Sequence, residues 1–445
     1  MTESLAFRYL IVNHVPLGRC ASPQHLRVGA MWMHDLRAQR DALRAVGAEL
    51  IVACPLVDEL RVEKSGSFDL IEVDLAAEGF SFVPLPYYES LKGWWKTRHT
   101  ARAMLAQAIV NADVVHLGDG AHPIPYDAIA WDLARHYGKK IVWVYDGADV
   151  LPRLVEHAES RRNALARAAW RYLIRQRERS SRAHVREAEL VFAHNAAVVQ
   201  RFADAWGPHC HFFDRSFVTD DVLIGAAELD ARCAELRDRR RPLRLVAAGR
   251  QIRIKGTDQV LRAMASARAQ GTELELEVFG DGEDLPAFRE LARELGLADR
   301  VRFLGSVPYG RELFDHLRRS QVMMITNLTP EISRNVLLAM ALGLPILGYR
   351  NAGTDELLSK SGAGVLTPPG DVEALARAMI HAAQDRESLV DQARGGRAVA
   401  GEKTLEGCHR ERARLVGELV RASASATAAA DQRSNVQRSK KPSRM

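Results

Sequence analysis

The 445-residue sequence has few cysteines and no long apolar segment. Its five cysteines are far apart and never form a C-x-x-C pair, which indicates neither a zinc site nor a disulfide framework. No apolar run approaches the roughly 20 residues that a membrane-spanning helix needs, and the first residues lack the basic and small-residue features of a signal peptide. We therefore expect a cytoplasmic protein without a metal site.

Aromatic residues are also scarce, at 7%, whereas hydrophobic residues make up 47% of the chain. This composition is typical of a soluble α/β protein, and 445 residues exceed what one hydrophobic core usually serves. Short aliphatic runs such as YLIVNHV and ELIVACP alternate with helical segments, and the same alternation restarts at LRLVAAG. This pattern predicts two Rossmann-like domains, each with a parallel sheet, that face a central cleft where ligands bind.

The domain boundaries follow from where the polar segments lie. We place the first domain at residues 1–225 and the second at 242–402, joined by a polar, charge-rich linker at 226–241. Residues 403–421 are expected to form a last helix that returns to the first domain. Residues 422–445 are basic and poor in apolar side chains, so we expect a disordered tail.

Two glycine turns in the second half carry the strongest chemical signal. Gly249 and Arg250 follow a strand, and Lys255 and Gly256 come just before a helix. Two cations beside a helix N-terminus suit an anion, and a diphosphate is the expected ligand, although a solvated loop would explain the same residues. The next strand ends in a second glycine turn, where the backbone either approaches a ligand or simply bends tightly. The residues of that second turn are Gly280, Asp281 and Gly282.

A third element is a loop around Glu331 that opens a helix. Ser333 or a backbone amide at this helix start would meet phosphate, and Glu331 would accept hydrogen bonds from sugar hydroxyls. The alternative for Glu331 is a carboxylate that only complements the helix dipole.

The order and spacing of these three elements resemble the donor-binding domain of family 4 glycosyltransferases, which have the GT-B architecture. The similar stretch runs from about Leu243 to Leu389 and includes VRFLG, AMALGLP and the residues around Gly353. The resemblance implies that Arg250 and Lys255 hold the diphosphate of a UDP- or GDP-sugar and that Glu331 contacts the hexose. The donor-binding residues that it implies are Gly249, Gly256, Gly280, Asp281, Gly282, Leu304, Ser333, Arg334, Asn335 and Glu356.

The chain departs from the family's E-x7-E motif. The second glutamate would fall at Ala339 or Leu338, so one ribose-binding carboxylate is missing. Arg334 lies in a stretch that is often glycine in the family, and Glu356 is a candidate to replace the lost hydroxyl contact.

In the first half, polar residues near the predicted strand ends mark an acceptor side. They are His116, Asp119 and His122 around the strand ADVVHLG, Asp146 after KIVWVYD, and Gly18 in the loop HVPLGRCASP. Three of them have a simpler alternative: a core histidine for His116, a turn aspartate for Asp146, and a strand-to-helix connection for Gly18. Asp119 and His122, past the strand end, are better placed to meet a ligand.

Two basic features suit an anionic membrane surface. Trp94 and Trp95 stand beside Lys96 and Arg98, and the segment from Arg161 to Arg186 holds nine arginines against one acid. Peripheral contact with the inner face of the cell membrane is therefore expected, with a packed loop as the alternative for the tryptophans. Nucleic acid is not expected, because few aromatic side chains lie among the cations.

These features predict an enzyme of the glycosyltransferase class in polysaccharide or glycolipid assembly. It would move a hexose-type sugar to a hydroxyl acceptor without a cofactor, with retention as the resemblance implies. The expected catalytic residues are Arg250, Lys255, Glu331 and Asp119. Two alternatives remain, a GT-B nucleotide-sugar epimerase and a non-catalytic GT-B subunit that binds a nucleotide sugar, and the missing glutamate favours the second of them.

Overall fold

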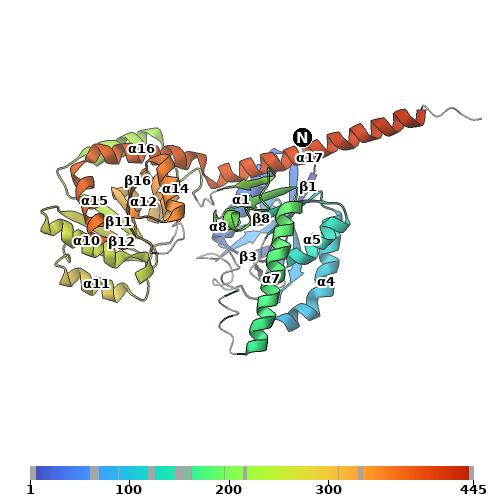
Figure 1. Cartoon of the computed structure of the whole chain (residues 1–445), viewed down its shortest axis with the longest axis horizontal. Coiled ribbons are helices and arrows are strands. Elements are labelled where there is room, and N and C mark those ends of the chain that lie inside the picture. The colour runs from blue at the N-terminus through green and yellow to red at the C-terminus, as the bar shows by residue number, and fades with distance from the viewer. Residues whose placement is uncertain are drawn as a thin grey trace, which may run out of the picture. The chain divides into compact units, whose positions relative to one another are not determined.

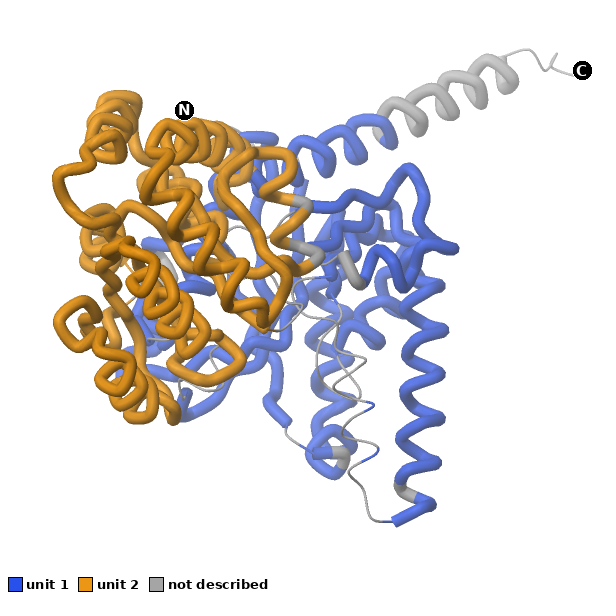
Figure 2. Tube along the Cα trace, turned by 60° about the vertical axis from the view of Figure 1, so that its left-hand side comes forward, with its two compact units in different colours: residues 1–215, 408–445 blue, residues 216–407 orange. Residues whose placement is uncertain are grey.

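The structure, a computed structural model, describes most of the chain (Figure 1). The described residues are 7–60, 70–88, 90–118, 126–145, 155, 159, 163–194, 196–213, 218–308, 310–328 and 334–439. They form two compact units, residues 1–215 with 408–445 and residues 216–407 (Figure 2). Each unit is an α/β structure built on its own sheet.

Unit 1 contains a ten-stranded sheet in its described part. Its path is β10 (Cys210–Phe212), β9 (Leu190–Ala193), β8 (Lys140–Tyr145), β7 (Val114–Gly118), β1 (Phe7–Val12), β4 (Ala48–Val57), β2 (Leu17–Arg19), β3 (His25–Gly29) and β5 (Leu70–Asp74), with β6 (Ser81–Pro86) also paired to β4. The strands from β10 to β4 are parallel, whereas β3 runs antiparallel to β2 and β5. The parallel strands are almost continuously buried, as expected for a sheet covered on both faces.

Two hydrophobic cores cover the two faces of this sheet. The helices described in unit 1 are α1 (Ala30–Ala45), α3 (Leu75–Glu78), α4 (Leu91–Val110), α5 (Tyr126–His136), α7 (Ala164–Glu187), α8 (Ala196–Arg201) and, from Cys408 onward, α17 (Leu405–Ser439). Leu10 of β1 packs in one core with α4, α5 and α7, and its neighbour Tyr9 packs in the other with α1 and α17. Successive residues of a strand point to opposite faces, which explains the division.

The described part of unit 2 holds a six-stranded, all-parallel sheet. Its order is β13 (Val301–Gly305), β12 (Leu274–Phe279), β11 (Leu243–Ala248), β14 (Val322–Ile325), β15 (Ile346–Tyr349) and β16 (Gly364–Thr367). The helices are α9 (Ala226–Arg237), η1 (Arg253–Lys255), α10 (Thr257–Ala269), α11 (Leu285–Glu294), α12 (Arg311–Arg319), α13 (Asn335–Ala341), α14 (Ala352–Ser361), α15 (Val372–Gln384) and α16 (Arg386–Glu402). In its central strands the side chains alternate between two buried cores, as the doubly wound pattern predicts.

The segment predicted as a linker is mostly helical. Residues 226–237 form α9, and its Cys233 and Leu236 are buried in the core of unit 2. Arg232 is also buried, and its guanidinium donates to the backbone carbonyls of Arg318 and Ser320. Cys233 and Leu236 are three positions apart and therefore lie on one face of α9, which packs against unit 2. The many charged residues around them made the segment resemble a linker in the sequence.

The tail also differs from the prediction. Helix α17 continues to Ser439, through most of the segment that we expected to be disordered. Residues 424–430 read ASATAAA, and alanine has the highest helix propensity of all residues, which favours helix without a core to pack against.

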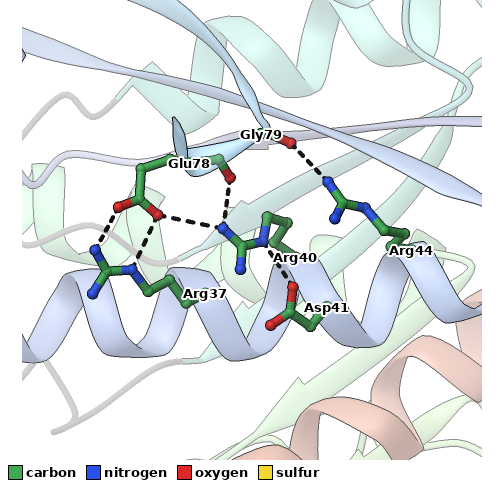
Figure 3. Close-up of polar contacts among 6 residues, drawn as sticks. All are labelled: Arg37, Arg40, Asp41, Arg44, Glu78 and Gly79. Atoms are coloured by element: carbon green, nitrogen blue, oxygen red, sulfur yellow. Dashed lines mark hydrogen bonds and ion pairs between the residues drawn. The ribbon is translucent and has the colours of Figure 1, made fainter. Parts of the chain in front are cut away.

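Charged side chains of α1 hold the short helix α3 in place (Figure 3). Arg37 and Arg40 both donate to the carboxylate of Glu78, which is 6% exposed, and Arg40 also donates to its backbone carbonyl at 2.6 Å. Arg44, one turn further, donates to the carbonyl of Gly79 at 3.5 Å. The three arginines are three to four residues apart and so lie along one face of α1.

Candidate functional site

The two predicted glycine turns meet at the C-terminal edge of the unit 2 sheet. Gly249 follows β11 and Gly280 follows the neighbouring strand β12, with φ angles of +143° and +110°. A Cβ atom on Gly280 would lie 1.9 Å from the carbonyl oxygen of Gly249, and one on Gly282 would lie 2.4 Å from that of Gln251. The two turns are therefore in direct backbone contact. Glycine adopts the positive φ angles and, lacking a Cβ atom, leaves room for this contact.

Gln251 joins the two turns through its side chain. It is 2% exposed, and its Nε2 donates to the carbonyls of Gly249 at 2.8 Å and Phe279 at 2.9 Å. Its Oε1 accepts from the hydroxyl of Thr257, the first residue of α10, at 2.9 Å. Nothing in the spacing of the glycines and cations pointed to this residue, although its position directly after Arg250 was a usable signal.

Two further residues connect this edge to its neighbours. Thr326, just after β14, donates through Oγ1 to the carbonyl of Lys255 at 3.0 Å. Asn335, at the start of α13, donates through Nδ2 to the carbonyl of Ala248 at 2.6 Å. The ends of three adjacent strands and the starts of two helices therefore form one connected edge.

The predicted donor-site residues occupy different environments along this edge. Arg250 and Asp281 are exposed and Lys255 is half-buried, in η1. Leu304 is 41% exposed near the end of β13, and Arg334 is exposed at the start of α13. Hydrogen bonds and close backbone contacts bring the two glycine turns, Lys255 and Asn335 together.

Several predicted residues are not described in full. Glu331, Ser333, Asp119, His122 and Asp146 lie outside the described residues. Glu356 belongs to α14, but its side chain is outside the described part.

On the acceptor side, the structure places His116 inside unit 1. It is 9% exposed, and its ring packs edge-on against Tyr9 with 5.8 Å between centroids. Burial, reinforced by the charge of Arg412 in α17, holds the pKa of His116 well below its ordinary value. This environment is that of a neutral core histidine, the simpler of the two readings of the sequence.

Gly18 was predicted in a loop and lies instead in β2. It pairs with Arg27 of β3 and Val57 of β4, and a Cβ atom there would lie 2.8 Å from the Cβ of Leu60. The chain after β1 folds back onto the sheet at this point, and glycine permits the close approach.

A histidine–aspartate pair near the ends of β1 and β7 was not predicted. Nε2 of His14 lies 2.6 Å from Oδ2 of Asp127, and Oδ1 of Asp127 accepts from the amide of Gly118 at 3.2 Å. Asp127 is 1% exposed, and the ring of His14 stacks on Tyr126 with 5.6 Å between centroids. The available signal was a histidine two residues after the first strand and an acid in the first turn of a helix.

The predicted membrane-facing residues divide between core and surface. Trp94 is 8% exposed and packs beside Tyr88, whereas Trp95 is 63% exposed and is covered on one ring face by Arg98. Both belong to helix α4, so the loop considered as the alternative does not form.

Part of the predicted arginine segment forms α7. Arg182 and Arg186 both pair with Asp204, and Arg171 pairs with Glu159 at 2.9 Å. Acidic side chains that are distant in the sequence thus neutralise part of its charge.

Among the described residues, no group of three or more His, Cys, Asp or Glu side chains is suited to hold a metal ion. Within the same residues, no helix combines the length and apolarity needed to cross a membrane.

Residues 242–385 match the family model described as Glycosyl transferases group 1. The chain is similar to the amylovoran biosynthesis glycosyltransferase AmsK of Erwinia amylovora, with 26% identity over 163 residues, which are 35% of this chain and 40% of AmsK. It is also similar to the GDP-mannose-dependent alpha-(1-6)-phosphatidylinositol monomannoside mannosyltransferase of Mycobacterium tuberculosis (H37Rv), with 29% identity over 209 residues, 44% of this chain and 53% of that protein. The matches thus span about half the length of these relatives or less.

The similarity to a solved structure extends over nearly the whole chain. HepE of Anabaena, solved in complex with UDP, superposes with a TM-score of 0.60 at 16% identity, covering 93% of this chain and all of HepE. The two α/β units, one with a mainly parallel sheet and one with an all-parallel sheet, and this similarity together identify the fold as GT-B.

Proposed function

We propose that this protein is a glycosyltransferase that moves a sugar from a nucleoside diphosphate sugar to a hydroxyl of a polysaccharide or glycolipid acceptor. The observation that carries the proposal is the pair of contacting glycine turns beside Arg250 and Lys255, at the C-terminal edge of the unit 2 sheet. This edge lies inside the segment that matches the glycosyltransferase family model. Ligands of parallel α/β sheets bind at that edge.

The chemistry follows from the charge that develops on the leaving diphosphate. As the sugar departs, negative charge grows on the phosphate oxygens, and the Arg250 guanidinium and Lys255 ammonium would stabilise it. The N-terminus of α10, which begins at Thr257 directly after Lys255 and Gly256, adds the positive end of its helix dipole. In this proposal Glu331 holds the hexose and Asp119 acts on the acceptor side.

The proposed donor is a UDP- or GDP-sugar. HepE was solved with UDP, and the mycobacterial relative is named as GDP-mannose-dependent. Uridine and guanosine nucleotides are therefore both represented among the similar proteins. We further propose that the sugar is a hexose and that its configuration is retained.

We also propose that unit 1 contacts an anionic membrane surface. Helix α7 exposes Leu165 at 81% and Tyr172 at 62%, seven residues apart and so on one face, with Arg171 and Arg175 exposed nearby. Apolar side chains flanked by cations suit the headgroup region of an anionic bilayer. Such contact would bring the enzyme to a lipid-linked acceptor.

The test of the main proposal combines nucleotide binding with turnover. Wild-type protein is expected to bind UDP or GDP in calorimetry and to transfer sugar to an acceptor from a glycan and glycolipid panel. Lys255→Ala should lower turnover by on the order of a hundredfold, as loss of one charge-stabilising group commonly does. Arg262→Ala, an exposed cation on α10, is the matched control and should keep full turnover.

Other outcomes would favour the alternatives. Nucleotide-sugar binding without transfer to any acceptor would indicate a non-catalytic subunit. Conversion of the sugar nucleotide itself in the absence of an acceptor would indicate an epimerase. Unchanged transfer by Lys255→Ala would contradict the role assigned to this cation.

A further inference from the structure

We infer that Gln251 is a positioning residue that holds the two glycine turns in the arrangement that binds a diphosphate. The inference rests on the proposed function, because it concerns the donor site of that function. It adds a residue that is neither charged nor a glycine, and that need not touch the donor itself.

The side chain of Gln251 bridges three separate backbone segments. The carboxamide nitrogen donates to the carbonyl of Gly249, in the first turn, and to that of Phe279, the last residue of β12. The carboxamide oxygen accepts from the Thr257 hydroxyl at the start of α10. These three bonds are between 2.8 and 2.9 Å long, within the normal range.

The backbone of Gln251 adds two more connections to the second turn. Its amide donates to the carbonyl of Asp281 at 3.0 Å, and its carbonyl accepts from the amide of Asp284 at 3.1 Å. Main chain and side chain of one residue therefore attach both turns to each other and to α10.

Only a carboxamide of this length meets the three requirements at one planar group. Two donors must reach two carbonyl oxygens while one acceptor faces a hydroxyl. Glutamate would place an acceptor-only group against two carbonyls, and methionine would fill the space without any of the bonds. The position is buried, so each group left without a partner is costly.

The contacts of Gln251 matter for donor binding because Arg250 and Lys255, which are proposed to bind the diphosphate, belong to the segment that Gln251 holds in place. Arg250 directly precedes Gln251, and Lys255 ends the turn just before α10. If the bridge is lost, the turns gain freedom in the unliganded protein, and a donor must order them when it binds. The expected loss is therefore specific to the diphosphate part of the ligand.

The test measures dissociation constants for UDP, GDP and their monophosphates by calorimetry. Gln251→Met should weaken binding of the preferred diphosphate by about tenfold or more, since three hydrogen bonds are removed, while binding of the monophosphate changes less. Thr257→Val removes one of the three bonds from the opposite side and should produce a smaller effect in the same direction. In steady-state assays, KM for the donor should rise while KM for the acceptor stays the same.

Gln392→Met is the matched control. Gln392 is a buried glutamine of α16 in the same unit, bonded to Ser388, and its replacement should leave both dissociation constants unchanged. Urea unfolding of each variant separates loss of stability from loss of binding. If Gln251→Met fails to fold, Thr257→Val carries the test.

The outcomes distinguish the inference from the function on which it rests. Wild-type protein that binds neither UDP nor GDP would overturn the proposed function. Wild-type binding that is unchanged in folded Gln251→Met and Thr257→Val, or that falls equally for monophosphate and diphosphate, would overturn the role of Gln251 alone.

Discussion

At the scale of single residues, the site depends on backbone conformations that only glycine adopts easily. Gly280 combines a positive φ with a Cβ position that is occupied by another carbonyl oxygen. Gly271 also has a positive φ, of +80°, but nothing lies within 4 Å of its Cβ position. Substitution at Gly271 therefore measures the cost of the backbone conformation alone, whereas substitution at Gly280 adds the cost of a steric clash.

Gly280→Ala should reduce the free energy of unfolding by about 2–4 kcal/mol, because it adds a clash to an unfavourable conformation. Gly271→Ala should cost only about 1 kcal/mol, since it adds conformational strain alone. Urea unfolding of both variants measures the difference. Equal costs would show that the two turns can separate without penalty.

Titration of a packed histidine should make unit 1 sensitive to acid. His184 lies between Trp131 and Trp143, with centroids 4.1 Å from each, and burial lowers its pKa to about 4 from 6.5. Below pH 6.5 the unfolded chain binds a proton at this position that the folded unit does not. The neutral, buried His184 therefore contributes its full share to the free energy of unfolding above pH 6.5. That share is lost as the pH falls from 6.5 toward 4.

His184→Phe should flatten that dependence. The measurement is the free energy of unfolding of wild type and variant at intervals between pH 7 and pH 4. The wild type should lose more stability over this range than the variant, and parallel curves would contradict the assignment.

At the scale of elements, packing decides which side chains of a segment are buried and which are exposed. Trp94 and Trp95 are neighbours in the sequence, yet α4 turns one into the core and the other to the surface. Helix α7 is attached at its C-terminal end, where Val185 is fully buried, whereas Leu165 near its start is exposed. The exposed half of α7 is the element that we propose contacts lipid.

Replacing Leu165 and Tyr172 together with serine should weaken binding to vesicles that contain anionic lipid by about tenfold or more, because two apolar side chains no longer enter the bilayer surface. Co-sedimentation with anionic and with zwitterionic vesicles measures the effect. Tyr137→Ser is the control. Tyr137 directly follows α5 in the same unit and is 41% exposed, but it does not belong to α7. Equal binding of all three proteins would count against contact through α7.

At the scale of the whole molecule, unit 1 is built from two distant parts of the chain. The segment from Cys408 onward joins residues of the first half, and its Ala413 and Val416 are buried in the same core as Tyr9. His409 also pairs with Asp35 of α1 at 3.0 Å. Unit 1 is therefore complete only when the last part of the chain has been made.

Deleting residues 408–445 should destabilise unit 1 and leave unit 2 folded, because this segment belongs to unit 1 and supplies Ala413 and Val416 to its core. Limited proteolysis followed by mass mapping would show early cleavage within residues 7–213 and protection within 218–407. Deleting only residues 424–445 is the control and should change neither unit. Loss of both units in the first deletion would contradict the division into separate cores.

Much of the fold and part of the site were predictable from local patterns. The alternation of aliphatic runs and helical segments predicts two parallel-sheet units, and the glycine turns with Arg250 and Lys255 were identified by spacing. The polar contacts of Gln251 and the pairing of His14 with Asp127 were not, because they join residues whose separation in sequence carries no periodic signal.

The sequence by itself determined the class of fold, the order of its elements and the location of the two glycine turns, since these depend on hydrophobic periodicity and on conformations available only to glycine. Tertiary structure alone decided that residues 226–237 pack as α9, that His116 lies in a core and that Gln251 connects the turns. Burial and hydrogen bonding between distant segments are properties of the folded chain, because a side chain's environment is made by residues that the linear order does not place beside it.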